Sequence, residues 1–167
     1  MERKKIAFWM YENSGGKEIQ DKICKKLLER NIDTLCEVDL RNAIAKNGHI
    51  LHNGNKLDKL DLFLSYNASK QTQYQMYLYK ALSKVIPMIN SYESFELSED
   101  KFQTAFVLRK NKILTPDYKL CHRDDNQHLQ SIIKQWSKMV YKPTDGWGGM
   151  GLTKIDSSEK LEMLMPF

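Results

Sequence analysis

Alternating apolar and polar positions divide the chain into short strands and amphipathic helices. An apolar run at residues 5–10 predicts a buried strand, and Ile19, Ile23 and Leu27 then follow at helical spacing. A second strand is predicted at residues 34–40. Since a strand, a helix and a strand within this length predict a parallel βαβ unit, we expect the chain to begin as an α/β domain.

Polar residues follow a third predicted strand. The pair Asn53-Gly54 first predicts a small antiparallel hairpin, and the mostly apolar residues 60–65 then predict a main strand of the sheet. Ser65 and Asn67 stand at its carboxyl end, where open α/β sheets bind ligands, so we predict that they contact a substrate. Capping of the next helix is an equal alternative for both residues.

The next helix and strand complete a first domain at residues 1–90. We expect the apolar stripe of a helix at residues 71–84 to face the core. The stripe consists of Tyr74, Tyr77, Leu78, Ala81, Leu82 and Val85. A fourth short strand at residues 86–89 contains Pro87, which favours a sheet edge or a strand start.

From residue 91 onward the chain is acidic and helical, which predicts a second domain at residues 91–167. Ser98 is the predicted N-cap of a helix. Lys101 falls in the first turn, where a cation opposes the helix dipole and is tolerated best beside an anion; a random surface lysine is the alternative. A strand at residues 117–121 and a helix at residues 127–136 are expected to follow.

A glycine-rich segment follows a predicted strand at residues 139–141. The strand ends on Lys142, whose ammonium can neutralise an anion, and the glycines beyond it leave backbone N–H groups free to converge on phosphate oxygens. These glycines are Gly146, Gly148, Gly149 and Gly151. A mobile turn beside a lysine is the alternative. Because the lysine precedes the glycines, the segment is neither a P-loop nor a dinucleotide-binding turn.

Composition and charge limit the partners. The 167 residues carry a net charge of +5, spread over many short lysine-bearing segments. This distribution indicates solvated helix faces first, attraction to anionic small molecules second, and a nucleic acid partner only a distant third. The apolar run at residues 6–10 is too short for a signal peptide or a membrane span, so we expect a cytoplasmic protein with no membrane partner.

Cysteine and histidine spacing predicts neither disulfides nor metal. Cys24, Cys36 and Cys121 are an odd number at wide spacing, which argues against a disulfide framework or a zinc site and predicts buried thiols. The four histidines fall in separate turns and helix starts, so no metal is assigned to them.

Three segments of the chain resemble one family. INSYESFELSEDKFQTAFVLRKNKILTPDYKL, followed by MVYKPTDGWGGMGL, resembles the ATP-grasp superfamily, and the upstream GHILHNGNKLDKLDLFLSYNAS looks like the N-terminal domain of its glutathione synthetase and RimK-like glutamate ligase branch. The resemblance implies an α/β fold class: a Rossmann-like pre-ATP-grasp domain with a parallel sheet at residues 1–90, then the first small α+β subdomain of an incomplete ATP-grasp domain at residues 91–167.

The resemblance also implies a reaction. Such ligases use ATP to phosphorylate a carboxylate, and an amine attacks the acylphosphate to form an amide. Carried over by position, Lys101 and Lys142 would contact the ATP phosphates. The flap over the phosphates would comprise Gly146, Trp147, Gly148, Gly149, Met150 and Gly151. The substrates would be an amino acid or peptide carboxylate and an amine. No nucleophile or general base is evident, so catalysis would consist of positioning and charge stabilisation.

The second subdomain of an ATP-grasp fold, with its magnesium ligands, has no counterpart before residue 167. We therefore expect a fragment of a ligase about twice this length, inactive alone, with magnesium bound by residues outside this chain. The alternative is a non-catalytic nucleotide- or peptide-binding module that kept the fold, and a basic nucleic-acid-binding domain is a weaker third hypothesis. The sequence leaves open the identity of the substrates and the oligomeric state, a homo-oligomer included.

Overall fold

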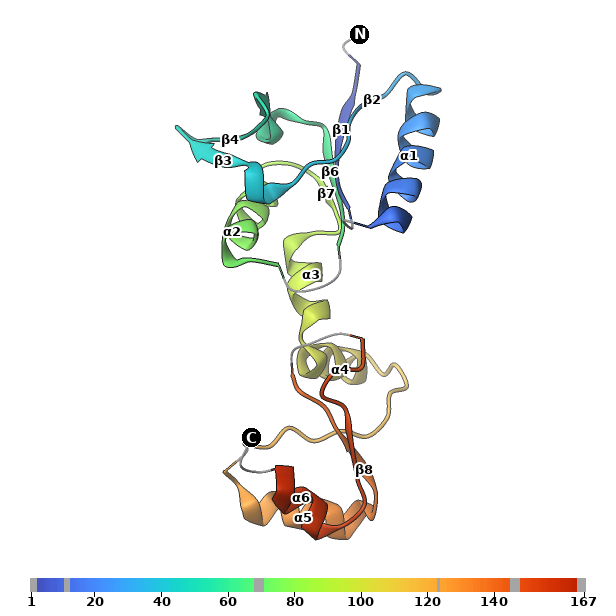
Figure 1. Ribbon diagram of the computed structural model, residues 1–167, viewed down its shortest axis with the longest axis vertical. Helices are drawn as coiled ribbons and strands as arrows, with labels where there is room; N and C mark the ends of the chain where they lie inside the picture. Colours follow the sequence, from blue (N-terminus) through green and yellow to red (C-terminus); the bar gives the residue numbers. More distant parts are fainter. Residues whose placement is uncertain (1–2, 11–12, 68–70, 123, 145–147, 165–167) are drawn as a thin grey trace. The chain divides into compact units, whose positions relative to one another are not determined.

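The chain divides into two compact units, Met1–Phe95 and Glu96–Phe167. This computed structural model describes residues 3–10, 13–67, 71–122, 124–144 and 148–164 (Figure 1). The division falls within helix α3 (Tyr92–Glu99). The domain boundary expected at residue 90 therefore stays a prediction, and each unit is described by itself.

A four-stranded parallel sheet organises the first unit (Figure 1). Its order is β2-β1-β6-β7, and its strands are β1 (Lys5–Met10), β2 (Asp33–Leu35), β6 (Leu62–Tyr66) and β7 (Met88–Ile89). Strand β1 is central and aligns Ala7 with Leu35 on one side and with Phe63 on the other. The predicted parallel sheet is present, but β2 is three residues long, whereas we expected a strand at residues 34–40.

Successive side chains of β1 enter two different hydrophobic cores, because adjacent residues of a strand point to opposite faces of the sheet. Ala7 and Trp9 belong to the larger core, on the side of helix α2 (Gln73–Leu82). Phe8 and Met10 belong to the smaller core beneath helix α1 (Ser14–Leu28). In Figure 1 the two helices flank the strands. Burial on both faces explains why the sequence of β1 is apolar without alternation.

Helix α2 buries Leu78 and Leu82 of the predicted stripe but not its tyrosines or Val85. Its buried residues are Gln75, Leu78, Tyr79 and Leu82. Tyr77 and Val85, which the prediction placed in the core, are 64% and 61% exposed. The helix turns its Tyr79 side inward because that fully buried ring packs edge-on against Trp9, 5.3 Å away between centroids, and its hydroxyl donates a hydrogen bond to the carbonyl oxygen of Asn90.

A small antiparallel sheet interrupts the first unit between β2 and β6. It contains β3 (Ile44–Lys46), β4 (His49–His52) and β5 (Asn55–Lys56), with the short 3₁₀ helices η1 (Leu40–Asn42) and η2 (Leu57–Lys59) beside it. The predicted Asn53-Gly54 hairpin is confirmed, with φ of 47° and 78°. Asn47-Gly48 forms a second such turn, with φ of 51° and 75°, and joins β3 to β4. Positive φ at both turn residues favours Asn-Gly.

The second unit combines helices with one hairpin. Its elements are α4 (Lys101–Lys110), α5 (Asn126–Trp136), β8 (Met139–Tyr141), β9 (Thr153–Ile155) and α6 (Ser158–Leu164). Ile133 of α5, Ile155 of β9 and Leu161 of α6 form its core.

Two predictions in this unit are wrong. Ser98 lies inside α3, and Asp100 caps α4 instead, since its side chain accepts a hydrogen bond from the Gln103 N–H at 2.8 Å. No strand forms at residues 117–121, where none of the described strands provides a ladder partner. This segment is held by side chains: Lys119 donates to Gln135 at 2.6 Å and lies over the ring of Trp136.

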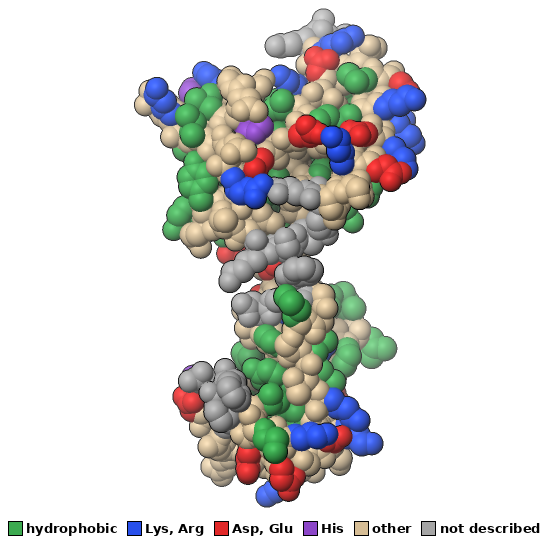
Figure 2. All heavy atoms as spheres, viewed as in Figure 1, with side chains coloured by type: hydrophobic (Ala, Val, Ile, Leu, Met, Phe, Trp, Pro, Cys, Tyr) green, Lys and Arg blue, Asp and Glu red, His purple; other side chains and the backbone are tan. Residues whose placement is uncertain are grey.

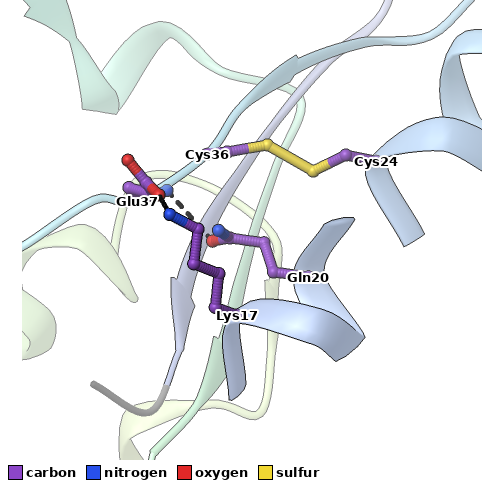
Figure 3. The surroundings of a disulfide bond; sticks show 5 residues. All are labelled: Lys17, Gln20, Cys24, Cys36 and Glu37. Carbon is purple, nitrogen blue, oxygen red and sulfur yellow. Dashed lines mark hydrogen bonds and ion pairs between the residues drawn. A yellow bond between two sulfur atoms is a disulfide. The ribbon is translucent and has the colours of Figure 1, made fainter. Parts of the chain in front are cut away.

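A disulfide between Cys24 and Cys36 links α1 to the residue after β2 (Figure 3). The prediction that both are buried thiols is therefore wrong. The two cysteines are far apart in the sequence, so their spacing did not indicate a pair. They meet because the chain reverses after α1 and forms β2, which lies parallel to β1 with its end against one face of α1. Cys121 is a free, partly exposed thiol.

Candidate functional site

The glycine-rich segment connects two antiparallel strands. Strand β8 pairs with β9 from Met139↔Ile155 to Tyr141↔Thr153, so the loop begins with Lys142. Gly146 and Trp147 lie outside the described residues. Lys142, Gly148, Gly149, Met150 and Gly151 are all exposed. The loop therefore lies on the surface of the second unit, where a ligand could reach its backbone.

Local geometry requires glycine in the second half of this loop. Gly148, Gly149 and Gly151 have φ of 62°, 79° and 74°, in the left-handed region that residues with a Cβ rarely adopt. At Gly151 a Cβ would in addition stand 2.6 Å from Cγ of Pro143. The backbone of the loop thus approaches its own first residues closely, and its N–H groups are not screened by side chains.

Lys101 belongs to the same part of the second unit as Lys142. Its backbone N–H donates a hydrogen bond to the carbonyl oxygen of Thr144, 3.0 Å away and two residues beyond Lys142. The start of α4 is therefore attached to the first residues of the loop. Two lysines, a helix N-terminus and a glycine-rich backbone so near one another can bind a polyphosphate, because each contributes positive charge or N–H donors.

The described residues offer no evident metal ligands. Nowhere in the described ranges do three or more His, Cys, Asp or Glu side chains gather as a metal-binding group. Among the same residues, none of the helices is long and apolar enough to cross a membrane.

Ser65 and Asn67, the predicted substrate contacts, lie at the end of β6 in the first unit. Ser65 is 2% exposed and aligns with Trp9, and the Asn67 amide donates to the carbonyl oxygen of Trp9 at 2.8 Å. Neither caps α2, whose N-cap is Thr72. Contact of Ser65 and Asn67 with a substrate stays a prediction.

A cavity of about 510 Å³ opens in the first unit beside the residues that follow β1 and β2. Its lining residues come from the end of β1, the N-cap and first turns of α1, and the segment from β2 into η1: Met10, Asn13, Ser14, Lys17, Gln20, Glu37, Val38, Asp39 and Arg41. Asn13 caps α1 by accepting the Gly16 N–H at 2.7 Å, and Ser14 is the first helical residue.

Charges of both signs face this cavity. Lys17 pairs with Glu37 at 3.1 Å, and Arg41 pairs with Asp39 at 3.0 Å. Burial alone would raise the pKa of Asp39, but the hydrogen bonds and charge of Arg41 outweigh it and hold that pKa below its usual value. On the face shown in Figure 2, acidic and basic side chains are interspersed over the surface of the first unit.

The cavity was not predicted, because β2 ends five residues earlier than the strand expected at residues 34–40. With a strand assigned to residues 34–40, Glu37 and Asp39 were treated as alternating strand positions. Polar residues just past the carboxyl end of a parallel strand are candidates for ligand contact, and β2 in fact ends at Leu35. If the strand had been predicted to end at Leu35, residues 36–41 would have been candidates for ligand contact for the same reason as Ser65 and Asn67.

One curated protein of known activity is similar in sequence. The tetrahydromethanopterin:α-L-glutamate ligase of Methanocaldococcus jannaschii is 27% identical over 115 residues, which are 66% of this chain and 39% of the ligase. No family model matches the chain.

Solved structures resemble the chain over almost its whole length. A RimK domain ATP-grasp protein from Sphaerobacter thermophilus matches 98% of the chain with a TM-score of 0.66 at 12% identity, and the match covers 57% of that protein. D-alanyl-alanine synthetase A from Vibrio cholerae matches 99% with a TM-score of 0.60 at 10% identity and 56% of its own length.

A third solved structure contains a nucleotide. The N5-carboxyaminoimidazole synthase of Aspergillus clavatus, in complex with ADP and an aminoimidazole ribonucleotide, has a TM-score of 0.62 at 14% identity; the match covers 98% of the chain and 43% of that protein. These likenesses confirm the α/β fold class. The chain spans between 39% and 57% of the length of these relatives.

Proposed function

Since the chain has the ATP-grasp fold and resembles RimK-like ligases, we propose that it forms part of a cytoplasmic, ATP-dependent carboxylate–amine ligase. The first solved relative is a RimK domain ATP-grasp protein, and the sequence relative is a glutamate ligase. Both support amide formation with an amino acid substrate. The substrates proposed for this protein are an amino acid or peptide carboxylate and an amine.

The hydrogen bond from the Lys101 N–H to Thr144 is the observation that carries the proposal. Without it, Lys101 and Lys142 would be two surface lysines far apart in the sequence. With it, the start of α4 and the loop after β8 form one cationic, N–H-rich region on an ATP-grasp fold. Such a region complements the negative charge of a triphosphate.

In the proposed reaction a carboxylate oxygen of the substrate attacks the γ-phosphorus of ATP and ADP departs. The amine then attacks the acyl carbon, the amide forms and inorganic phosphate departs. Lys142 and Lys101 neutralise the phosphate oxygens, and the loop from Gly148 to Gly151 supplies backbone N–H donors and excludes water. The predicted flap also includes Gly146 and Trp147, which lie outside the described residues.

Isothermal titration calorimetry of the protein with Mg-ATP tests this assignment. Lys142→Ala and Lys101→Ala should each weaken binding about tenfold or more, because each removes a charge-assisted hydrogen bond to phosphate. Lys154→Ala is the matched control. This exposed lysine of β9 pairs with Asp156 at 3.6 Å, in the same hairpin as Lys142.

The outcomes separate the proposal from its alternative. Undetectable binding at millimolar Mg-ATP, or an unchanged affinity in both lysine variants, would contradict the proposed nucleotide site. Binding without ADP release when amino acids and amines are supplied would favour a non-catalytic nucleotide-binding module. Equal losses in all three variants would show a general charge effect and not a defined site.

A further inference from the structure

Three side chains on one face of α1 are attached to two consecutive residues after β2 (Figure 3). Lys17, Gln20 and Cys24 share this face because they are three and four positions apart. Lys17 pairs with Glu37 at 3.1 Å, and the oxygen of the Gln20 side chain accepts the Glu37 N–H at 3.0 Å. Cys24 is bonded covalently to Cys36. We refer to these three links as the α1 clasp.

The three links differ greatly in strength. The Lys17 and Glu37 side chains are 65% and 66% exposed, and an ion pair exposed to this degree contributes little to stability. The hydrogen bond to Gln20 is buried, since Gln20 is 2% exposed, but it is one neutral bond. The disulfide is the only covalent link in the clasp and closes a loop with a sequence separation of 12. The disulfide is therefore the strongest link between residues 36 and 37 and α1, while Val38 beside them is held separately by its N–H, which donates to the carbonyl oxygen of Phe8 at 3.0 Å.

Glu37 is held in a conformation that it would not adopt freely. Its φ is 58°, in the left-handed region that is unfavourable for a residue with a long side chain. Such a residue stays there only while its surroundings hold it. Its neighbour Cys36 is fixed to α1 by the disulfide, and its own N–H is fixed by Gln20. Opening the disulfide leaves Glu37 attached to α1 by one buried hydrogen bond and one exposed ion pair, and attached to β1 only through its neighbour Val38.

The clasp also forms a wall of the cavity in the first unit. Lys17, Gln20 and Glu37 all line it, and Val38 and Asp39 follow directly in the chain. Any movement of residues 36 and 37 away from α1 must therefore alter the cavity and the charges that face it. The disulfide itself is packed in the smaller core, where Cys24 is 7% exposed and Cys36 is partly exposed.

We propose that Cys24–Cys36 is a reversible redox switch that closes the cavity wall when oxidised and releases it when reduced. It concerns the first unit alone and goes beyond nucleotide binding by the second. A dithiol reductant is the reaction partner. Its thiolate attacks the sulfur of the more exposed Cys36, Cys24 leaves as a thiolate and takes up a proton, and the second thiol of the reductant resolves the mixed disulfide. The reductant ends as a disulfide and the protein as two thiols; the reverse exchange with a disulfide partner of the same class, which is itself reduced to two thiols, re-forms Cys24–Cys36.

Cysteine use in the cell agrees with a switch. In the cytoplasm, the compartment proposed for this protein, disulfides are rare, and those that do form are mostly transient or redox-sensing. A permanent structural disulfide would not be expected there. A disulfide that forms under oxidation and opens under thiol reductants is the kind expected in the cytoplasm.

Two measurements on the intact protein test the switch. Alkylation followed by intact mass should add one label after mild oxidation, at Cys121, and three labels after dithiothreitol. Hydrogen exchange of the Glu37 amide should be about tenfold faster in the reduced protein, because its link to buried Gln20 then opens more often. Exchange of the Phe63 amide, which donates to Pro87 within the central sheet at 3.0 Å, should not change.

Matched variants separate the switch from general loosening. Cys24→Ser with Cys36→Ser should show fast Glu37 exchange whether or not dithiothreitol is present. Cys121→Ser should keep the full redox response. Three labels after oxidation, or equal Glu37 exchange in both redox states, would overturn the proposal. Loss of the circular dichroism signal of the wild-type chain on reduction would also overturn it, since the disulfide would then be structural.

Discussion

A Cβ atom placed on Gly151 would lie 2.6 Å from Cγ of Pro143, closer than real Cβ contacts allow. The two residues stand at opposite ends of the glycine-rich loop. Pro143 has a rigid ring and cannot move aside as a flexible side chain would. The loop therefore has a fixed closure point beside β8 and β9, even though its residues are exposed.

Gly151→Ala should consequently destabilise the second unit more than Gly148→Ala does. Both positions have positive φ, so each alanine costs about 1–2 kcal/mol from the backbone alone. At Gly148 no atom lies within 4 Å of the added Cβ, whereas at Gly151 the contact with Pro143 adds about 1–3 kcal/mol. Urea unfolding of both variants measures the difference. Equal stabilities would show that Pro143 does not constrain the loop.

Removing one negative charge at the start of α4 should strengthen ATP binding. Asp100→Asn keeps the cap on the Gln103 N–H, because asparagine caps as well as aspartate, but it deletes a charge that repels phosphate. We expect affinity for Mg-ATP to rise roughly twofold to fivefold. Asp125→Asn makes the same change at the N-cap of α5 and should leave affinity unaltered. A matching rise in both variants would argue against a phosphate site at α4.

The hydroxyl of Tyr79 should contribute measurably to the stability of the first unit. It donates to the carbonyl oxygen of Asn90 inside the larger core, and burial raises the pKa of this phenol. Tyr79→Phe should lower the free energy of unfolding by about 1 kcal/mol. Tyr77→Phe, on the exposed side of the same helix, should change it by less than about 0.5 kcal/mol. Denaturant unfolding of both variants provides the comparison.

Acidification should destabilise the first unit through His52. This side chain is 4% exposed, and its Nε2 accepts the Asp39 N–H at 3.3 Å. Burial lowers its pKa below 6.5, although the charge of Asp39 opposes the shift. The unfolded chain therefore binds the proton more readily, so stability is fully present above pH 6.5 and is lost as the pH falls toward the lower folded pKa.

His52→Gln retains a buried acceptor and should flatten the stability profile between about pH 7 and pH 5. His122→Gln, at a side chain that is 76% exposed, should leave the profile unchanged. Thermal unfolding across this range measures both. An unaltered slope in His52→Gln would assign the acid sensitivity to other groups. The lowered pKa of Asp39 is a separate effect, because its contribution is lost only below 3.8.

Local signals predicted the features whose cause is local. The Asn53-Gly54 turn follows from positive φ at two neighbouring residues, and the strand at residues 5–10 was indicated by its own apolar run. The glycine-rich loop was also identified locally, by its run of glycines, and three of them have a positive φ in the structure. These features need no knowledge of distant parts of the chain.

Features that depend on distant contacts were not predictable. The buried face of α2 is set by the fit of Tyr79 against Trp9, and periodicity alone placed Tyr77 there. The disulfide and the cavity both require that β2 end at Leu35 and that α1 lie against the next residues. Likewise, the link between Lys101 and Thr144 is a backbone hydrogen bond that no sequence pattern specifies.

The position of β1 at the centre of the parallel sheet has a consequence for synthesis on the ribosome. This first strand is made early, yet its longest pairing is with β6, which ends at Tyr66, and β7 joins the sheet only at Ile89. The edge of β1 that pairs with β6 therefore stays unpaired until β6 emerges, although β2 can pair with the other edge earlier. Nascent polypeptides shorter than this should therefore depend on chaperones, and folding of the first unit should begin abruptly once β6 has left the exit tunnel.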